Sequence, residues 1–155
     1  MGKIAPPTYL DNHEAVLTAF GYWPTFHDSE VVSLLMDQSG ILFDKIHNAR
    51  IEIVVHAFEW TESKERSEPI FNHHLVHFAF ENVSEVALEG FNHQNALHSF
   101  DFEEVPEDAS CNHSFKVSLK SALGLGGEFA ASNGEVISVI SCDQEGNPLP
   151  SPSGN

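Results

Sequence analysis

The chain has 155 residues, the length of one ordinary domain, and 41% of them are hydrophobic, as in globular rather than disordered proteins. Seven Lys and Arg against 23 Asp and Glu give a formal net charge of −16. Nucleic acids and anionic membranes need a basic surface, so this charge argues against both as partners and favours a basic protein. Acidity that merely keeps the protein soluble is the alternative reading.

A short helix is the first predicted element. Asp11 or Asn12 can cap its N-terminus, Glu14 lies in its first turn, and residues 15–20 supply apolar side chains. Gly21 is expected to end it. Because Pro24 cannot continue a helix, residues 22–30 are expected to form an ordered connector that is rich in aromatic residues.

Alternation of apolar and polar residues then predicts eight or nine strands. They are expected at about residues 32–37, 41–43, 51–57, 75–81, 85–89, 99–103, 114–120 and 136–142. Gln38, Ser39 and Gly40 predict a turn between the first two. No regular strand–helix alternation occurs, which argues against a parallel sheet. The expected fold is mainly β (α+β): a twisted antiparallel sheet, sandwich or open barrel with one short N-terminal helix.

Residues 1–145 are expected to form a single β-rich domain, and residues 146–155, which are rich in Pro, Gly and Ser, a disordered tail. The N-terminus lacks the apolar region of a secretory signal, and no apolar run is long enough to cross a bilayer. We therefore expect a cytoplasmic protein with Cys111 and Cys142 as free thiols. The two cysteines can pair only if their strands are neighbours.

Two groups of residues invite a metal or small-ligand hypothesis. His73, His74 and His77 are close in sequence, but on a strand His73 and His77 would lie about 13 Å apart, and His74 would face the other side. Exposed strand or loop histidines are therefore the favoured interpretation.

The second group comprises His27, Asp28 and Glu30. A histidine beside a carboxylate can act as a general base or a ligand. Turn capping by Asp28 or Ser29, with His27 bonded to nearby backbone, is the favoured interpretation.

Catalysis has little support in the sequence. No Gly-x-Ser-x-Gly nucleophile motif is present, and acidic surroundings would raise rather than lower the pKa of the Cys111 thiol. The glycines at 124, 126 and 127 are not followed by the Lys-Ser/Thr of a phosphate-binding loop, and strand bending explains them better. We expect a non-enzymatic protein without a cofactor or metal.

Two acidic segments are the best candidates for binding a protein partner. The alternative is that both are solvated loops. Together they could form a surface of one charge sign. The predicted partner-binding residues are Glu59, Glu62, Glu65 and Glu68 in the first segment, and Asp101, Glu103, Glu104, Glu107 and Asp108 in the second.

Residues 21–31 read GYWPTFHDSEV, residues 90–97 read GFNHQNAL and residues 124–129 read GLGGEF. The first segment resembles the WPxFHDxEV pattern of the immunity protein 50 family, and the other two are similar to later parts of it. The resemblance implies a bacterial, cytoplasmic antitoxin that binds and blocks a toxin domain, and it supplies no catalytic residue. The motif residues, which we expect to serve the fold, are Trp23, Pro24, Phe26, His27, Asp28 and Glu30.

Three hypotheses therefore remain open. The first is an immunity protein that inhibits a toxin, for which a basic toxin domain is the expected partner, through an acidic surface. The second is a metal- or small-ligand-binding β-domain that uses one of the two histidine groups. In the third, an exposed strand edge makes a homodimer, so the chain can be monomeric or dimeric.

Overall fold

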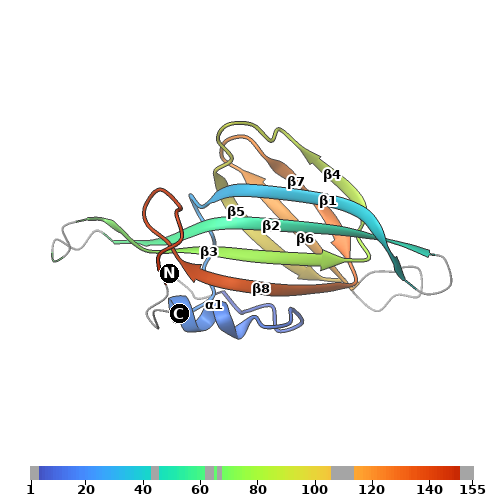
Figure 1. The fold of residues 1–155 in the computed structure, drawn as a ribbon, viewed down its shortest axis with the longest axis horizontal. Helices are drawn as coiled ribbons and strands as arrows, with labels where there is room; N and C mark the ends of the chain where they lie inside the picture. Colours follow the sequence, from blue (N-terminus) through green and yellow to red (C-terminus); the bar gives the residue numbers. More distant parts are fainter. Residues whose placement is uncertain (1–3, 43–45, 62–64, 66–67, 106–113, 151–155) are drawn as a thin grey trace.

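A computed structural model describes residues 4–42, 46–61, 65, 68–105 and 114–150 (Figure 1). One helix and eight strands follow one another along this part of the chain, which confirms the predicted mainly β fold. The elements are α1 (Glu14–Phe20), β1 (Glu30–Leu42), β2 (Ile46–Trp60), β3 (Ile70–Glu81), β4 (Ser84–Glu89), β5 (Leu97–Glu104), β6 (Phe115–Ser121), β7 (Gly126–Ala131) and β8 (Asn133–Ser141).

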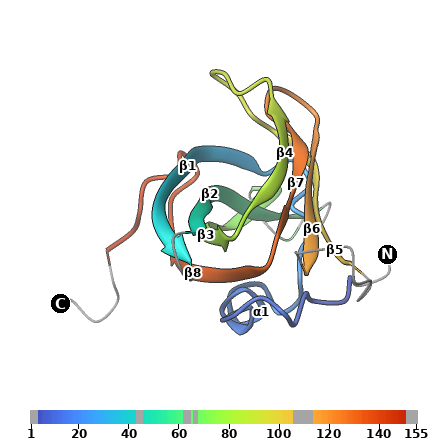
Figure 2. The same cartoon turned by 90° about the vertical axis from the view of Figure 1, so that its right-hand side faces the viewer.

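The strands form two four-stranded antiparallel sheets that do not close into a barrel. The first sheet has the order β1-β2-β3-β8 and the second β4-β7-β6-β5. Figure 2 shows the two sheets facing each other, with α1 beside the open edge between β8 and β5. The predicted fold class is therefore confirmed, and of the alternatives that the sequence left open the structure shows two facing sheets.

Aromatic side chains fill the space between the sheets. Phe78 on β3 contacts Phe100 on β5, with ring centroids 5.1 Å apart, and Phe80 contacts Phe129 on β7 at 5.2 Å. All four side chains are at most 2% exposed. Burying one such ring stabilises the fold by roughly 1.5–3 kcal/mol, so this aromatic core contributes a large share of the stability of the domain.

The helix ends as predicted but begins differently. Gly21 adopts φ 80° and its N–H donates to the carbonyl of Leu17, 2.7 Å away. The predicted capping by Asp11 or Asn12 is wrong, because the N-cap residue is His13 and no side chain caps it. Asn12 instead donates from Nδ2 to the carbonyl of Val136 on β8, 2.9 Å away, and so ties the start of the helix to the first sheet.

The predicted turn at residues 38–40 is also wrong, because β1 continues to Leu42. The ladder with β2 carries a register shift between Asp37 and Gly40, and a second between Val31 and Ser33. Such bulges insert an extra residue without ending the strand. The second shift buries Val31 while Val32 is 47% exposed, so the alternation in sequence does not report the buried face at the start of β1.

The predicted tail begins with residues that contact the first sheet. Cys142 forms a β-bridge with Pro148, and the N–H of Leu149 donates to the carbonyl of Ser141, 2.9 Å away. Residues 151–155 lie outside the described part of the chain. Cys142 is buried and free, and Cys111 lies outside the described residues. No helix in the described residues is long and apolar enough to span a membrane.

Candidate functional site

The three sequence segments that carry the family resemblance meet in space. The connector before β1 pairs with the start of β5: the Asp28 N–H donates to the Leu97 carbonyl, and the Leu97 N–H donates to the Ser29 carbonyl, each over 2.8 Å. Glu30 and Ala96 form an isolated antiparallel bridge. The first two segments therefore run side by side although about 65 residues separate them.

Asn95 joins all three segments and is only 3% exposed. Its Oδ1 accepts hydrogen bonds from the N–H groups of Asn92 and Leu125, at 2.9 and 3.1 Å, and its Nδ2 donates to the Asn92 carbonyl at 2.8 Å. Its own N–H donates to Oε1 of Glu30, 2.5 Å away. A Cβ atom on Gly124 would collide with this side chain, so a glycine is required there.

The residues of the first motif divide between the core and the surface. Trp23 and Phe26 are at most 3% exposed and contact each other, and Pro24 is buried. His27 and Asp28 are exposed and lie 3.6 Å apart, and His27 Nδ1 lies 3.0 Å from the carbonyl of His98. The exposed part of the motif thus reaches the surface at the edge of a groove.

This groove, called the acidic groove below, has a volume of about 670 Å³. It lies at the end of the first sheet that carries the β2–β3 turn. Its acidic lining comes from the connector before β1, the start of β1, the residues before β3 and the turn after β8. The lining side chains used below are Asp28, Glu30, Glu68 and Glu145, together with His56, Phe58 and His73.

A histidine pair lines the acidic groove, and one of its two members is buried. Nε2 of His56 on β2 lies 3.0 Å from Nδ1 of His73 on β3, and His56 is 8% exposed. Burial, and then the nearby His73, lower the pKa of His56. The neutral imidazole is thus favoured at neutral pH, and one ring nitrogen of the pair donates while the other accepts.

A tight turn after β8 supports the groove. Oδ1 of Asp143 accepts hydrogen bonds from the N–H groups of Glu145 and Asn147, each over 2.9 Å. The hydrogen bond from the Asn147 backbone is the main reason that the pKa of Asp143 is lowered. A charged Asp143 therefore remains close to His56, and the turn presents Glu145 at the rim.

The predicted partner-binding residues do not gather in one place. Glu65 and Glu68 are exposed beside the β2–β3 turn, and Glu59 accepts a hydrogen bond from Asn72 over 2.7 Å. In contrast, Glu104 pairs with Phe115, whose ring contacts Phe80 near the opposite end of β3. The described parts of the two acidic segments thus lie at different ends of the sandwich. Glu62, Glu107 and Asp108 lie outside the described residues.

The other residues of the second acidic segment have local contacts. Asp101 lies 3.6 Å from the Lys120 ammonium, and Glu103 and Glu104 are exposed. Burial raises the pKa of Tyr9 to about 12, with Glu104 and Glu103 adding to the shift, so both carboxylates lie near this tyrosine. The described part of this segment therefore provides acidic surface, and none of its acidic residues lines the acidic groove.

The structure separates the three histidines that the sequence places together. His73 lies in the acidic groove, His74 packs against Phe20 of α1 with ring centroids 5.2 Å apart, and His77 lies 2.8 Å from Oε1 of Glu52. Among the residues that the structure describes, no three His, Cys, Asp or Glu side chains converge to hold a metal ion. Neither predicted histidine group therefore forms a metal centre by itself.

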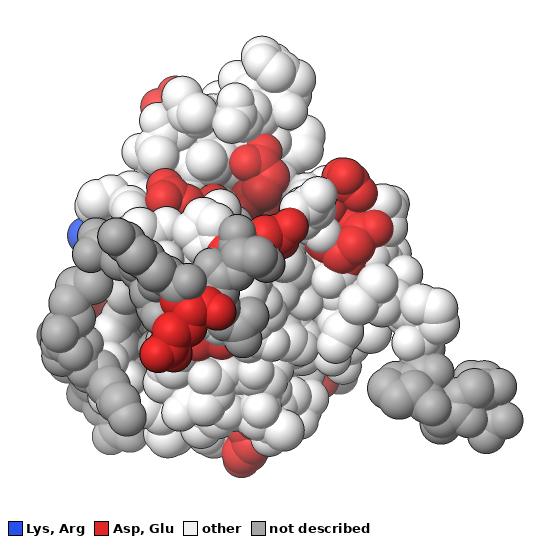
Figure 3. Space-filling view, turned by 90° about the vertical axis from the view of Figure 1, so that its left-hand side faces the viewer, with Lys and Arg blue, Asp and Glu red and all other residues white. Residues whose placement is uncertain are grey.

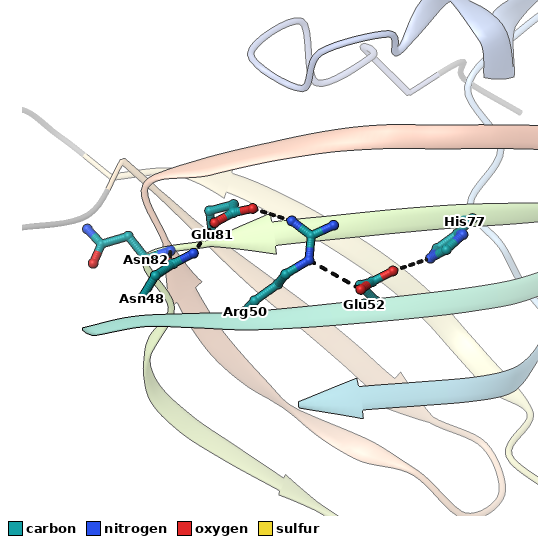
Figure 4. Close-up of polar contacts among 6 residues, drawn as sticks. All are labelled: Asn48, Arg50, Glu52, His77, Glu81 and Asn82. Carbon is teal, nitrogen blue, oxygen red and sulfur yellow. Dashed lines mark hydrogen bonds and ion pairs between the residues drawn. The ribbon is translucent and has the colours of Figure 1, made fainter. Parts of the chain in front are cut away.

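His77 belongs instead to a polar ladder across the outer face of the first sheet (Figure 4). Glu52 binds both His77 and Arg50, and Arg50 also binds Glu81, which accepts a hydrogen bond from Asn48. Burial would raise the pKa of Glu52, but the hydrogen bonds from Arg50 and His77 prevail and lower it. The polar side chains of this ladder thus bond to one another.

The three basic side chains that the structure describes are all paired with carboxylates. Arg50 binds Glu52 and Glu81, Lys116 lies 3.0 Å from Glu128, and Lys120 lies near Asp101. None of these pairs includes a residue of the acidic groove. Among the residues that Figure 3 colours, acidic side chains are spread over the end of the molecule that carries the β2–β3 turn, and a basic side chain is visible only at its margin.

Sequence reasoning named four of the ten described lining residues and missed the other six, of which three matter most for the argument. His56 is an isolated histidine in an apolar strand, Phe58 follows it by two positions, and Glu145 stands where the predicted domain ends. The pairing of β2 with β3 brings His56 to His73, and no spacing in the sequence specifies that register. A histidine within an otherwise apolar strand was the one available signal.

A family model gives independent information on this chain. The model for immunity protein 50 matches residues 12–140, which include α1, β1 to β7 and all of β8 except its last residue, whereas Glu145 of the acidic groove lies beyond the match. The chain belongs to the immunity protein 50 family. Comparisons with curated proteins and with solved structures found no match. The predicted family is thus confirmed, and the family name implies a protein partner and a non-enzymatic role.

Proposed function

We propose that this immunity protein 50 family member is a cytoplasmic, bacterial immunity protein that binds a basic toxin domain and blocks it, without catalysing a reaction. The observation that carries the proposal is the acidic groove. Its carboxylates approach from four segments of the chain, and none of them is neutralised by a described lysine or arginine. A binding surface that is already neutralised internally would have little attraction for a basic partner.

The charge of the whole chain supports the same partner class. A net charge of −16 attracts cationic proteins and accelerates their encounter. Toxin domains that act on nucleic acids need a basic surface, since they must approach phosphates. An acidic protein can occupy that surface and so exclude the nucleic acid.

Co-expression with the toxin encoded by the neighbouring gene tests the proposal. We expect cells that produce the toxin to survive when this protein is present, and the two proteins to purify as a complex. Survival without complex formation, or a complex that leaves the toxin active, would contradict the proposal. A catalytically inactive toxin serves as the binding partner for purification, so binding is measured separately from toxicity.

A further inference from the structure

The acidic groove combines aromatic rings with carboxylates. Phe58, His56 and His73 form a cluster in which ring centroids lie 5.7 Å apart between Phe58 and His73 and 5.1 Å apart between the two histidines. Phe58 and His73 are half-buried and therefore partly accessible from the groove. Asp28 and Glu145 line the same groove and are exposed.

This combination favours a guanidinium group over other cations. A guanidinium is planar and weakly hydrated, so it stacks on aromatic faces while its N–H groups point at carboxylates in its plane. A lysine ammonium attracts the same carboxylates but is strongly hydrated and offers no plane to stack. A neutral urea group has the same planar shape as a guanidinium but carries no charge, so the carboxylates do not attract it in the same way.

His56 adds no positive charge to the groove at neutral pH. It is buried, and burial lowers its pKa, so its neutral imidazole is favoured in the contact with His73. Asp143, whose carboxylate is held by the turn after β8, adds a further negative charge beside His56. The groove thus carries negative charge to which a cationic group of a partner can bind.

The size of the groove indicates what carries the guanidinium. Its volume of about 670 Å³ is within the range of sites for whole small molecules and exceeds what one side chain fills. Its walls come from separate segments, and the exposure of Asp28, Glu68 and Glu145 shows that it is open to the surface. This shape fits a protruding segment of a protein, with an arginine at its centre and neighbouring residues against the rim.

We propose that the acidic groove receives an arginine side chain from an exposed segment of the protein partner, with the guanidinium stacked on the Phe58–His73 rings and held by Asp28 and Glu145. This assignment rests on the proposed function, because the toxin is the protein that would supply the arginine. The chemistry of the groove can nevertheless be examined without the toxin.

The first experiment titrates the full-length protein with N-acetyl-L-arginine amide and follows the ring signals of His56, His73 and Phe58 by NMR at about pH 7.5 and low salt. We expect saturable shifts in the millimolar range, which is typical of one side chain binding alone. N-acetyl-L-lysine amide should bind at least about threefold more weakly, and N-acetyl-L-citrulline amide should give no saturable shift. Equal shifts with citrulline amide, or none with arginine amide, would overturn the assignment.

Charge-neutral variants locate the binding. Asp28→Asn keeps a residue type that tolerates the φ of 64° found there, and Glu145→Gln changes an exposed side chain, so both should fold. Each should weaken binding of arginine amide about two- to fivefold. Glu89→Gln is the matched control, because Glu89 is exposed on β4 of the second sheet and does not line the groove. If this control weakens binding equally, general acidity rather than the groove attracts the probe.

The toxin separates failure of this assignment from failure of the proposed function. If Asp28→Asn and Glu145→Gln bind the inactive toxin as tightly as the unmodified protein does, the toxin is bound elsewhere, and the groove assignment is wrong while the immunity function stands. If the toxin is never bound, the function is wrong, and the arginine amide titration alone decides whether the groove takes a guanidinium. Loss of toxin binding in both variants, with Glu89→Gln unchanged, is the expected result.

Discussion

Asn95→Ala should strongly destabilise the protein, because Asn95 is the buried junction of three distant segments. The substitution leaves the buried N–H of Leu125 and the N–H of Asn92 without their acceptor. An unsatisfied buried donor costs roughly 1–3 kcal/mol, and the second donor is partly reached by water. We therefore expect the free energy of unfolding to fall by about 2–4 kcal/mol, which corresponds to roughly 5–12 °C in Tm for a chain of this length.

Urea unfolding followed by tryptophan fluorescence measures this change, since Trp23 is 3% exposed and reports on the core. Asn92→Ala is the matched control: it removes the same amide from the same loop, but Asn92 Oδ1 accepts only the N–H of the exposed Gln94, over 3.0 Å. Its cost should stay below about 1 kcal/mol. If Asn95→Ala costs no more than Asn92→Ala, the junction does not hold the three segments together.

Three further predictions concern backbone and charge. Gly127→Ala should cost at least about 2 kcal/mol in urea unfolding, because φ is 135° and the new Cβ would overlap the Ala87 carbonyl; Gly21→Ala, with φ 80° and open space around it, should cost about 1 kcal/mol. Since burial lowers the pKa of His56, the unfolded state binds its proton more readily, and the free energy of unfolding should fall as the pH drops below 6.5. His56→Gln should make this dependence of stability on pH less steep, and an unchanged dependence would contradict the role of His56. The lowered pKa of Glu52 stabilises the fold above pH 4.5, and this contribution is lost as the pH falls below that value. Glu52→Gln should therefore lose less stability than the unmodified protein does below pH 4.5, as measured by urea unfolding at each pH.

The strands were predictable because a period of two is a local property of the sequence. Val76, Phe78 and Phe80 alternate with more polar neighbours, and all three are buried on β3. The division into two sheets was not predictable, because it depends on pairings between distant strands such as β3 with β8 and β4 with β7. The bulges in β1 show the same limit, since an inserted residue changes the exposed face without changing the sequence pattern.

The candidate site was predictable only in pieces. Asp28, Glu30 and His73 belonged to two separate ligand hypotheses, and Glu68 to an acidic segment, yet all four line one groove. Strand register and the turn after β8 bring them together, and neither has a signature in the spacing of these residues. The second acidic segment could not be excluded from the same surface, because sequence does not show that Glu104 lies near the opposite end of the sandwich.

The salt dependence of toxin binding tests the central claim most directly. Isothermal titration of the inactive toxin from the neighbouring gene would compare Kd at about 50 mM and about 500 mM NaCl, where the screening length falls from roughly 14 Å to roughly 4 Å. If a basic toxin docks on the acidic groove, Kd should rise at least about tenfold, and less than that in Asp28→Asn and Glu145→Gln. Tight binding with the same Kd at both salt concentrations would contradict an acidic docking surface.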